Sequence, residues 1–190
     1  MGQYYYLVPQ LPYLVFGQTP PMSPEAFREL AMPLMDEQDA ALLDLLGVGL
    51  KPPPGDAPSC GSDFIDKWRE WERILRLNLV KHRAAKLKRE APAAEPPVLP
   101  SGAVSAAVKA VQESPLEGEI TIDKARWSAI DTLLEGSGGF DRNAVFAYML
   151  KLIILNRQAL FQTERGFSEY KSLYASILEK SGKLSAGESK

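Results

Sequence analysis

Residues 141–160 read DRNAVFAYMLKLIILNRQAL, and this stretch decides the fold. Its apolar residues recur at spacings of three and four, which places them on one face of a helix, while others fill the opposite side. The first stripe holds Val145, Tyr148, Met149, Leu152, Ile153 and Leu160, and the opposite side holds Phe146, Leu150 and Ile154. A helix that is apolar nearly all round needs cover from other elements on every side. We therefore predict a helix of about 24 residues, capped by Asp141 and ending near Gly166, at the centre of a bundle.

Start and stop signals divide the rest of the chain into further helices. Ser23-Pro24-Glu25 combines a capping serine, a proline at the first helical position and an acid in the first turn. Asp36 can cap a short helix that ends at Gly47. Apolar residues at helical spacing predict helices over residues 62–90, 103–113, 122–134 and 167–180. The expected fold class is therefore all-α, a helical bundle of about seven helices.

Two segments are rich in proline, residues 51–61 (KPPPGDAPSCG) and 91–102 (APAAEPPVLPSG). Proline lacks a backbone donor and fixes φ, so neither segment can lie inside a helix. We expect an N-terminal helical part over residues 1–90, a proline-rich linker over 91–102 and a C-terminal helical part over 103–181. The two helical parts can form one bundle, because the central helix needs cover on all sides.

The sequence near the start of the chain is unusually rich in tyrosine. Residues 4–16 read YYYLVPQLPYLVF, and tyrosine and valine favour strands. A single strand has no partner in a helical chain, so we predict an extended, tyrosine-rich N-terminus that packs on the bundle. Whether its aromatic rings belong to the core or to an interface stays open at this point.

Composition excludes several classes of protein. The chain has 190 residues, of which 45% are apolar and 24% charged, so it is long enough for a core and is not a disordered chain. One cysteine and one histidine exclude a disulfide scaffold and argue against a zinc site of Cys and His ligands. The longest apolar run, residues 144–155, contains Lys151 and is too short to span a bilayer. These features predict a cytoplasmic protein with a reduced cysteine.

Candidate catalytic residues are few. Cys60 precedes a helix start, where a thiol pKa can fall, but the only histidine is His82, which lies some 30 Å further along the helix. The glycines at 136–139 lack the Lys-Ser of a phosphate loop and fit helix termination instead. An acidic group around Pro115 fits first-turn acids and solvated charges; its members are Glu113, Glu117, Glu119 and Asp123. We therefore predict no catalytic, metal or cofactor site, and no enzyme.

The helix expected over residues 62–90 is the longest, at about 40 Å, and it is basic. Formal charge is −5 over residues 1–62 (2 basic, 7 acidic), +4 over 63–90 (9 basic, 5 acidic) and −1 over 91–190 (11 basic, 12 acidic). Its basic residues are Lys67, Arg69, Arg73, Arg76, Lys81, Arg83, Lys86, Lys88 and Arg89.

Three interpretations of this basic helix stay open. It is a solvated helix face, in which Glu70 and Glu72 pair locally with Arg73 and Arg76, or a docking surface for an acidic partner, or a nucleic-acid groove. The chain's net charge of −2 argues against nucleic acid. Its interleaved aromatics, Trp68 and Trp71, share the helical spacing of core residues. The residues that we expect to bind a partner are Arg69, Arg73, Arg76, Arg83 and Lys86.

The sequence YYYLVPQLPYLVFG, followed by PPMSPEAF, resembles a family of small bacterial proteins that are encoded among V-type ATPase subunit genes. That family typically opens on a tyrosine-rich YYYLVASLP.L.FG pattern and continues with a stretch of Pro, Met, Ser and Glu. Pro9 and Gln10 depart from it, because small residues are common there. The matching residues are Tyr4, Tyr5, Tyr6, Leu7, Leu11, Pro12, Phe16, Gly17, Pro21, Met22 and Ser23.

Two later stretches are similar to helices of the C-type stalk protein of V/A-type ATPases, whose eukaryotic equivalent is the d-type protein. They are SPLEGEITIDKARWSAIDTL and FDRNAVFAYMLKLIILNRQALFQTERG. The resemblance implies a non-catalytic component or assembly factor of a bacterial V-type ATPase, which serves ion or proton transport by coupling the central stalk to the rotor ring. The chain is short for the C-type protein, which normally has three helical repeats, so a reduced version and an assembly factor both fit.

The same resemblance implies partners and a location. The partners are stalk or rotor subunits of the V-type ATPase, with no small-molecule substrate, and membrane association arises only through them. The location is the cytoplasm, peripheral to the inner membrane through the ATPase complex. The alternative is a stand-alone helical module that binds nucleic acid or another polyanion through residues 67–89.

Overall fold

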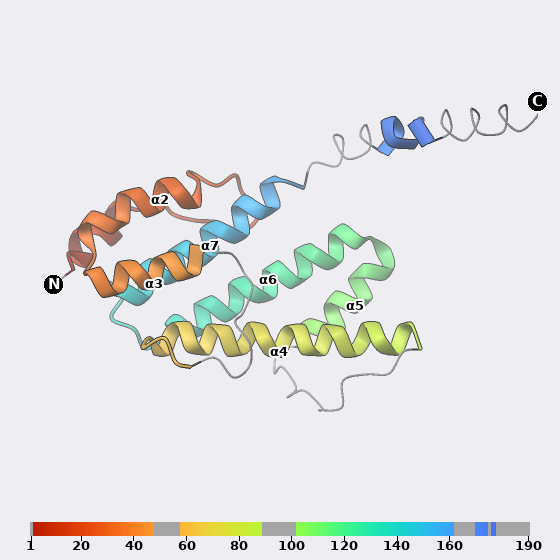
Figure 1. Ribbon diagram of the computed structural model, residues 1–190, viewed down its shortest axis with the longest axis horizontal. Coiled ribbons are helices and arrows are strands. Elements are labelled where there is room, and N and C mark those ends of the chain that lie inside the picture. Colours follow the sequence, from red (N-terminus) through yellow and green to blue (C-terminus); the bar gives the residue numbers. More distant parts are fainter. Residues whose placement is uncertain (1, 48–57, 89–101, 162–169, 175, 178–190) are drawn as a thin grey trace, which may run out of the picture. The chain divides into compact units, whose positions relative to one another are not determined.

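The computed structural model describes residues 2–47, 58–88, 102–161, 170–174 and 176–177. The chain divides into two compact units, Met1–Gln158 and Ala159–Lys190. Every regular element in the described part is helical, which confirms the all-α prediction (Figure 1). The elements in order are α1 (Tyr4–Leu7), the 3-10 turn η1 (Val8–Gln10), α2 (Pro24–Ala31), η2 (Met32–Leu34), α3 (Glu37–Gly47), α4 (Asp63–Lys86), α5 (Ala103–Glu113), α6 (Pro115–Leu134) and α7 (Arg142–Ala159).

Helix α7 is the central helix of the first unit, as its sequence predicts. Its buried residues are Val145, Phe146, Ala147, Met149, Leu150, Leu152, Ile154 and Leu155. They share one hydrophobic cluster with residues of α1, α2, α3, α4 and α6. The helix is shorter than predicted, because it ends at Ala159 and leaves Leu160 exposed, and residues 162–166 lie outside the described part.

The helix starts follow from capping side chains. The hydroxyl oxygen of Ser23 accepts from the amide of Ala26 at 3.1 Å, and that of Ser62 accepts from Ile65 at 3.4 Å. The Asp141 carboxylate accepts from the Ala144 amide at 3.1 Å. These contacts confirm the predicted starts of α2, α4 and α7.

The predicted start of α6 at Ile122 is wrong. The helix begins seven residues earlier, at Pro115, where the Ser114 hydroxyl oxygen accepts from the Leu116 amide at 3.2 Å. Ser114-Pro115 with Glu117 in the first turn repeats the signal that starts α2. Gly118, a poor helix former, conceals the continuity, but it is buried where α5 and α6 pack closely.

The predicted extended N-terminus is also wrong in its first part. Residues 4–7 form one α-turn and residues 8–10 a 3-10 turn; residues 11–15 have no regular structure. The turn is held locally, because the Gln3 amide donates to the Leu34 carbonyl at 2.7 Å and the Gln10 side chain donates to the Tyr6 carbonyl at 2.8 Å. Leu7 then enters the main core, so the segment does pack on the bundle.

A second, smaller hydrophobic cluster joins α4, α5 and α6. It contains Leu75, Val104, Ala107 and Ile122. In Figure 1 these three helices lie side by side, with α5 folded back along α6. Residues 91–101 of the predicted linker and 51–57 of the earlier proline-rich segment lie outside the described part.

The second unit is described only in part. Residues 170–174 and 176–177 are helical, within the helix predicted over 167–180, and the start of that helix lies outside the described residues. Tyr170 and Tyr174 stack there with ring centroids 6.1 Å apart. None of the helices that the structure describes has the length and apolarity to cross a bilayer.

Candidate interaction surface

The first half of α4 pairs its basic side chains with acids on the same helix. Arg73 donates to Glu70 at 2.6 Å, Arg76 to Glu72 at 2.9 Å, and Lys67 lies 2.8 Å from Asp63. The predicted local pairs are therefore confirmed. Arg69 lies 3.9 Å from Asp66 in the same way. Three of the five residues expected to bind a partner, Arg69, Arg73 and Arg76, thus already have carboxylate neighbours one turn away.

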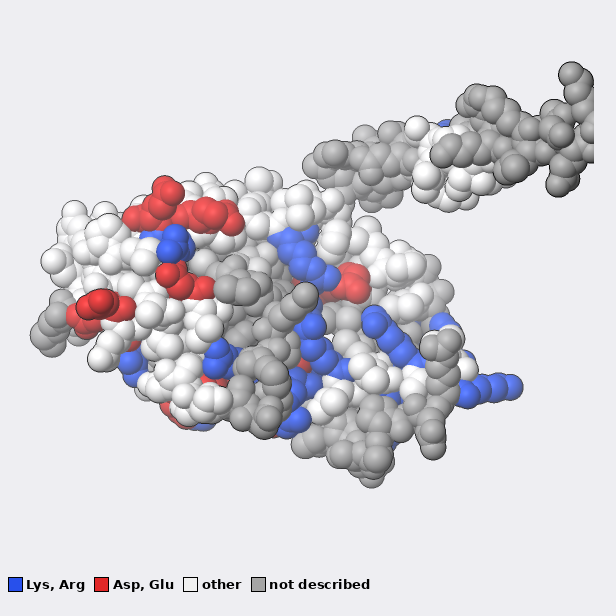
Figure 2. Space-filling view, viewed as in Figure 1, with Lys and Arg blue, Asp and Glu red and all other residues white. Residues whose placement is uncertain are grey.

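The second half of α4 is different. No acidic residue occurs between Glu72 and Glu90, whereas Arg83, Lys86 and Lys88 are exposed and form no ion pair within the described residues. Figure 2 shows Lys and Arg side chains along α4 and Asp and Glu side chains gathered over α2 and α3. The basic charge that a partner can reach is therefore concentrated at the C-terminal end of α4.

The N-terminal aromatic residues divide into a buried and an exposed group. Tyr4 is partly buried and donates to the Asp39 carboxylate, which Arg142 also contacts at 3.1 Å. Phe16 packs edge-on against Trp127 with centroids 5.6 Å apart. The exposed rings, as we name them, are Tyr5 (80% exposed), Tyr6, Tyr13 (91% exposed) and Phe140. Tyr5 stacks on Phe140 at 5.5 Å, so these two form one continuous aromatic patch.

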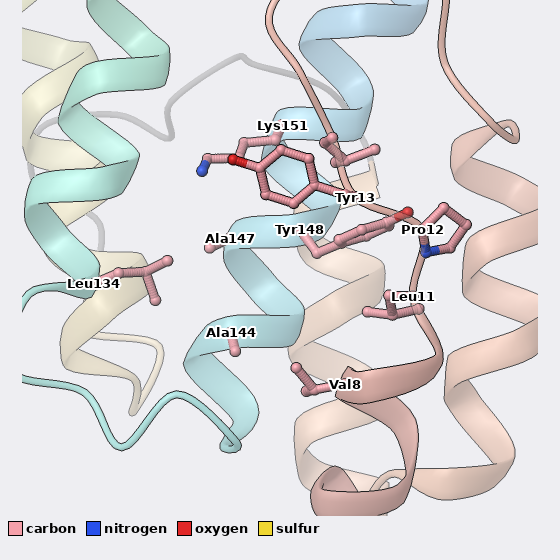
Figure 3. A pocket seen from close by; sticks show the side chains of 10 residues that line it. Val8, Leu11, Pro12, Tyr13, Leu134, Ala144, Ala147, Tyr148 and Lys151 are labelled. Carbon is pink, nitrogen blue, oxygen red and sulfur yellow. The ribbon is translucent and has the colours of Figure 1, made fainter.

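A pocket of about 230 Å³ lies beside Tyr13, between the N-terminal segment and α7 (Figure 3). Its wall is mainly apolar, with Tyr148 and Lys151 as its polar members; the others are Val8, Leu11, Pro12, Tyr13, Leu14, Leu134, Ala144 and Ala147. Lys151 is held at 2.5 Å from Asp131 and lies over the Trp127 ring at 4.8 Å. The pocket therefore suits an apolar side chain better than an anion.

Tyr148 adds one polar feature to this pocket. Its hydroxyl is buried and has no hydrogen-bond partner among the described residues. Burial raises the pKa of Tyr148 to about 12, so the hydroxyl stays protonated and can donate. An occupant with one acceptor beside an apolar group would match this wall.

A buried ion network joins α4, α6 and α7. Arg126 donates two hydrogen bonds to Glu72, at 2.7 and 3.0 Å, and a third to Asp123 at 2.9 Å. Arg157 donates to the same Asp123 oxygen at 2.6 Å and also contacts Glu119. The ion network consists of these five residues, whose charges balance closely and whose contacts fix the three helices relative to one another.

The expectation that Asp123 is a solvated charge is wrong, because its side chain is fully buried. Burial raises the pKa of Asp123, while Arg157 and Arg126 lower it in part. Sequence reasoning missed this role because Glu72 and Arg126 lie 54 positions apart. The available signal was local: Asp123 and Arg126 are three residues apart on one helix, on the side that carries Ile122 and Ile130.

The structure places the candidate catalytic residues in unremarkable settings. Cys60 is half-buried and free, and burial raises the pKa of its thiol, which opposes activation. His82 is exposed on α4, about 30 Å along the axis from the start of that helix. Gly136 and Gly139 have positive φ angles of 87° and 77° just after α6, which confirms helix termination. Within the described residues, no three potential metal ligands come together.

The described surface therefore offers two features that a protein partner could use, the exposed rings and the basic end of α4. The first is aromatic and lies beside an apolar pocket; the second is cationic. No family model, no curated protein and no solved structure matches this chain at a significant level.

Proposed function

We propose that this chain is a non-catalytic component or assembly factor of a bacterial V-type ATPase, similar to the C-type stalk protein, that binds components of the central stalk or rotor. The observation that carries the proposal is the tyrosine-rich N-terminal motif, which resembles that of proteins encoded among the genes of this enzyme. The motif is also where the chain presents aromatic rings to solvent.

The motif serves two purposes in this structure. Its buried members fix the segment on the bundle: Leu7 lies in the core, Phe16 contacts Trp127, and the Met22 carbonyl accepts from Asn156 at 3.0 Å. Its exposed members, Tyr5 and Tyr6, are not needed for that packing. Tyrosine is enriched at protein interfaces, because a rigid ring gives contact area and its hydroxyl still finds a partner.

A coupling protein must also transmit force without deforming. Arg126 and Arg157 join three helices through carboxylates, and α7 has side chains packed on all sides. Such packing resists local opening, because breaking any one contact leaves buried charges or voids. This supports a structural role in a complex and uses no reactive group.

Affinity purification tests the proposal. A tagged copy in its native cells should recover stalk or rotor subunits, identified by mass spectrometry. The variant Tyr5→Ala/Tyr6→Ala should lose them, because the two exposed rings are absent. The matched control is Tyr170→Ala/Tyr174→Ala, which removes a comparably exposed tyrosine pair from the second unit. Recovery of no ATPase subunit by the unaltered protein overturns the proposal.

A second candidate function rests on the exposed cations at the end of α4. There the chain would act as a stand-alone module that binds nucleic acid or another polyanion through residues 67–89. Such binding weakens steeply as salt rises, and Arg83→Glu/Lys86→Glu should abolish it. Binding that is absent or independent of salt removes this candidate.

A further inference from the structure

Helix α4 has a second apolar face that the bundle does not use. Its core side runs through Phe64, Trp68 and Leu75, which are buried. Leu77, Val80, Ala84 and Leu87 follow at spacings of three, four and three, and we call these four residues the outer seam. At about 100° per residue, the outer seam lies about 160° around the helix from Leu75, nearly opposite the core.

The outer seam is open to a partner. Val80 is 45% exposed and Leu87 62% exposed, while Leu77 and Ala84 are partly exposed. None of the four belongs to either hydrophobic cluster of the described residues. A repeat of three and four residues is the pattern by which one helix packs along another in a coiled coil.

Basic side chains flank the outer seam on both sides. Arg76 and Arg83 lie on one side of it and Lys81 on the other, by the same helical projection. In coiled coils the charges beside the apolar seam decide the partner. A second copy of this chain would place cations opposite cations, whereas an acidic helix would complement them.

We propose that the outer seam of α4 binds an acidic amphipathic helix of a partner protein, as a short coiled coil. The inference rests on the proposed role as an interaction protein, and it names the class of partner. Leu77 to Leu87 span about 15 Å, or three turns, so the contact alone is small and of the transient class. It would act together with the exposed rings, which lie on other elements.

Fluorescence anisotropy with a designed probe tests the proposal directly. The probe is a labelled three-heptad peptide with Leu at the two apolar positions and Glu at both flanking positions. Its own like charges keep it from pairing with itself. The unaltered protein should bind it, and should bind a peptide of the same apolar pattern with Lys at the flanking positions at least about tenfold more weakly.

Variants separate the seam from charge alone. Val80→Glu/Leu87→Glu should weaken binding of the acidic probe at least about tenfold, because two apolar anchors are lost and like charges are introduced. Leu30→Glu/Leu45→Glu is the matched control: the side chains are 45% and 44% exposed, on α2 and α3, and the change in net charge is the same. Lys81→Glu/Arg83→Glu should reverse the preference between the acidic and the basic peptide.

Three outcomes overturn the proposal. They are no binding of the acidic probe, equal affinity for polyglutamate or duplex DNA of the same charge, and unchanged binding by Val80→Glu/Leu87→Glu. Co-purification keeps this failure distinct from that of the proposed function: if Val80→Glu/Leu87→Glu still recovers ATPase subunits, the seam is wrong and the function stands. If the probe binds but no ATPase subunit is recovered, the seam stands and the ATPase role fails.

Discussion

Arg126 neutralises two buried carboxylates at once. It donates two hydrogen bonds to Glu72 and one to Asp123, and all three side chains are nearly inaccessible to water. Hydrogen bonds between ions of opposite charge are stronger than neutral ones, and the planar guanidinium suits two-point binding of a carboxylate. Burial lowers the pKa of Arg126, but Glu72 and Asp123 more than offset this and raise it, so the residue stays charged.

Arg126→Ala should therefore be one of the most destabilising single changes in the chain. We expect a loss of about 3–5 kcal/mol in the free energy of unfolding, because two carboxylates would stay buried without their partner. Urea unfolding followed by tryptophan fluorescence measures it, since Trp68, Trp71 and Trp127 pack against the core. Arg73→Ala breaks an exposed pair and should cost about 0–1 kcal/mol. Equal costs for the two variants would contradict the role of Arg126.

Cys60 provides a prediction that depends on pH. Burial raises the pKa of its thiol, so at neutral pH the folded chain holds less thiolate than the unfolded chain does. Alkylation by iodoacetamide should be slower in the folded protein than in urea at pH 7.5, and should accelerate as pH rises above about 8.5. Mass spectrometry of the labelled fraction against time gives the rates. Faster labelling of the folded protein would indicate an activated nucleophile and revive an enzymatic function.

At the scale of elements, serine-proline pairs define where helices begin. Ser23-Pro24 and Ser114-Pro115 both supply a capping hydroxyl and a proline whose missing donor costs nothing in the first turn. The first is recognisable from sequence and the second is not, because Gly118 and the scattered acids hide the apolar period there. Local signals thus predict the helices, while the buried ion pairs between helices depend on contacts between distant residues that no local pattern reveals.

Gly118 shows how closely α5 and α6 approach. A Cβ atom at this position would lie 2.1 Å from Cγ2 of Val111 and 3.4 Å from its Cα. We expect Gly118→Ala to cost about 1–3 kcal/mol through this clash, even though alanine favours helix by about 1 kcal/mol. In a Val111→Ala background the same change should be neutral or stabilising, because the clashing methyl group is gone. A thermal unfolding cycle of the four proteins measures this coupling, and simple additivity would argue against close packing.

At the scale of the whole molecule, the central place of α7 follows from its sequence, since an all-round apolar helix has no other stable position. Both hydrophobic clusters are built from described residues before Ala159. The two charge regions, acidic over α2 and α3 and basic over the end of α4, also follow from the sequence (Figure 2). The division of the N-terminal tyrosines into buried and exposed does not, because Tyr4, Tyr5 and Tyr6 are chemically identical and only the direction of the turn separates them.

Residues 1–158 should therefore fold without the rest of the chain. We expect a protein that ends at Gln158 to unfold cooperatively, with a free energy of unfolding within about 0.5 kcal/mol of the full chain, because the clusters and the ion network are retained. Urea titration with tryptophan fluorescence compares the two. A broad transition or a large loss would show that residues after Gln158 contribute to the core.

The contacts of the tyrosine-rich segment have a consequence for synthesis on the ribosome. Tyr4 meets Asp39, but Phe16 must wait for Trp127, and Met22 for Asn156. At about 5–20 residues per second, the interval between translation of Met22 and Asn156 is on the order of ten seconds. Throughout that interval the most aromatic stretch of the nascent chain lacks its final cover. Emerging YYYLVPQLPYLVF is thus a natural target for a chaperone that waits at the exit tunnel.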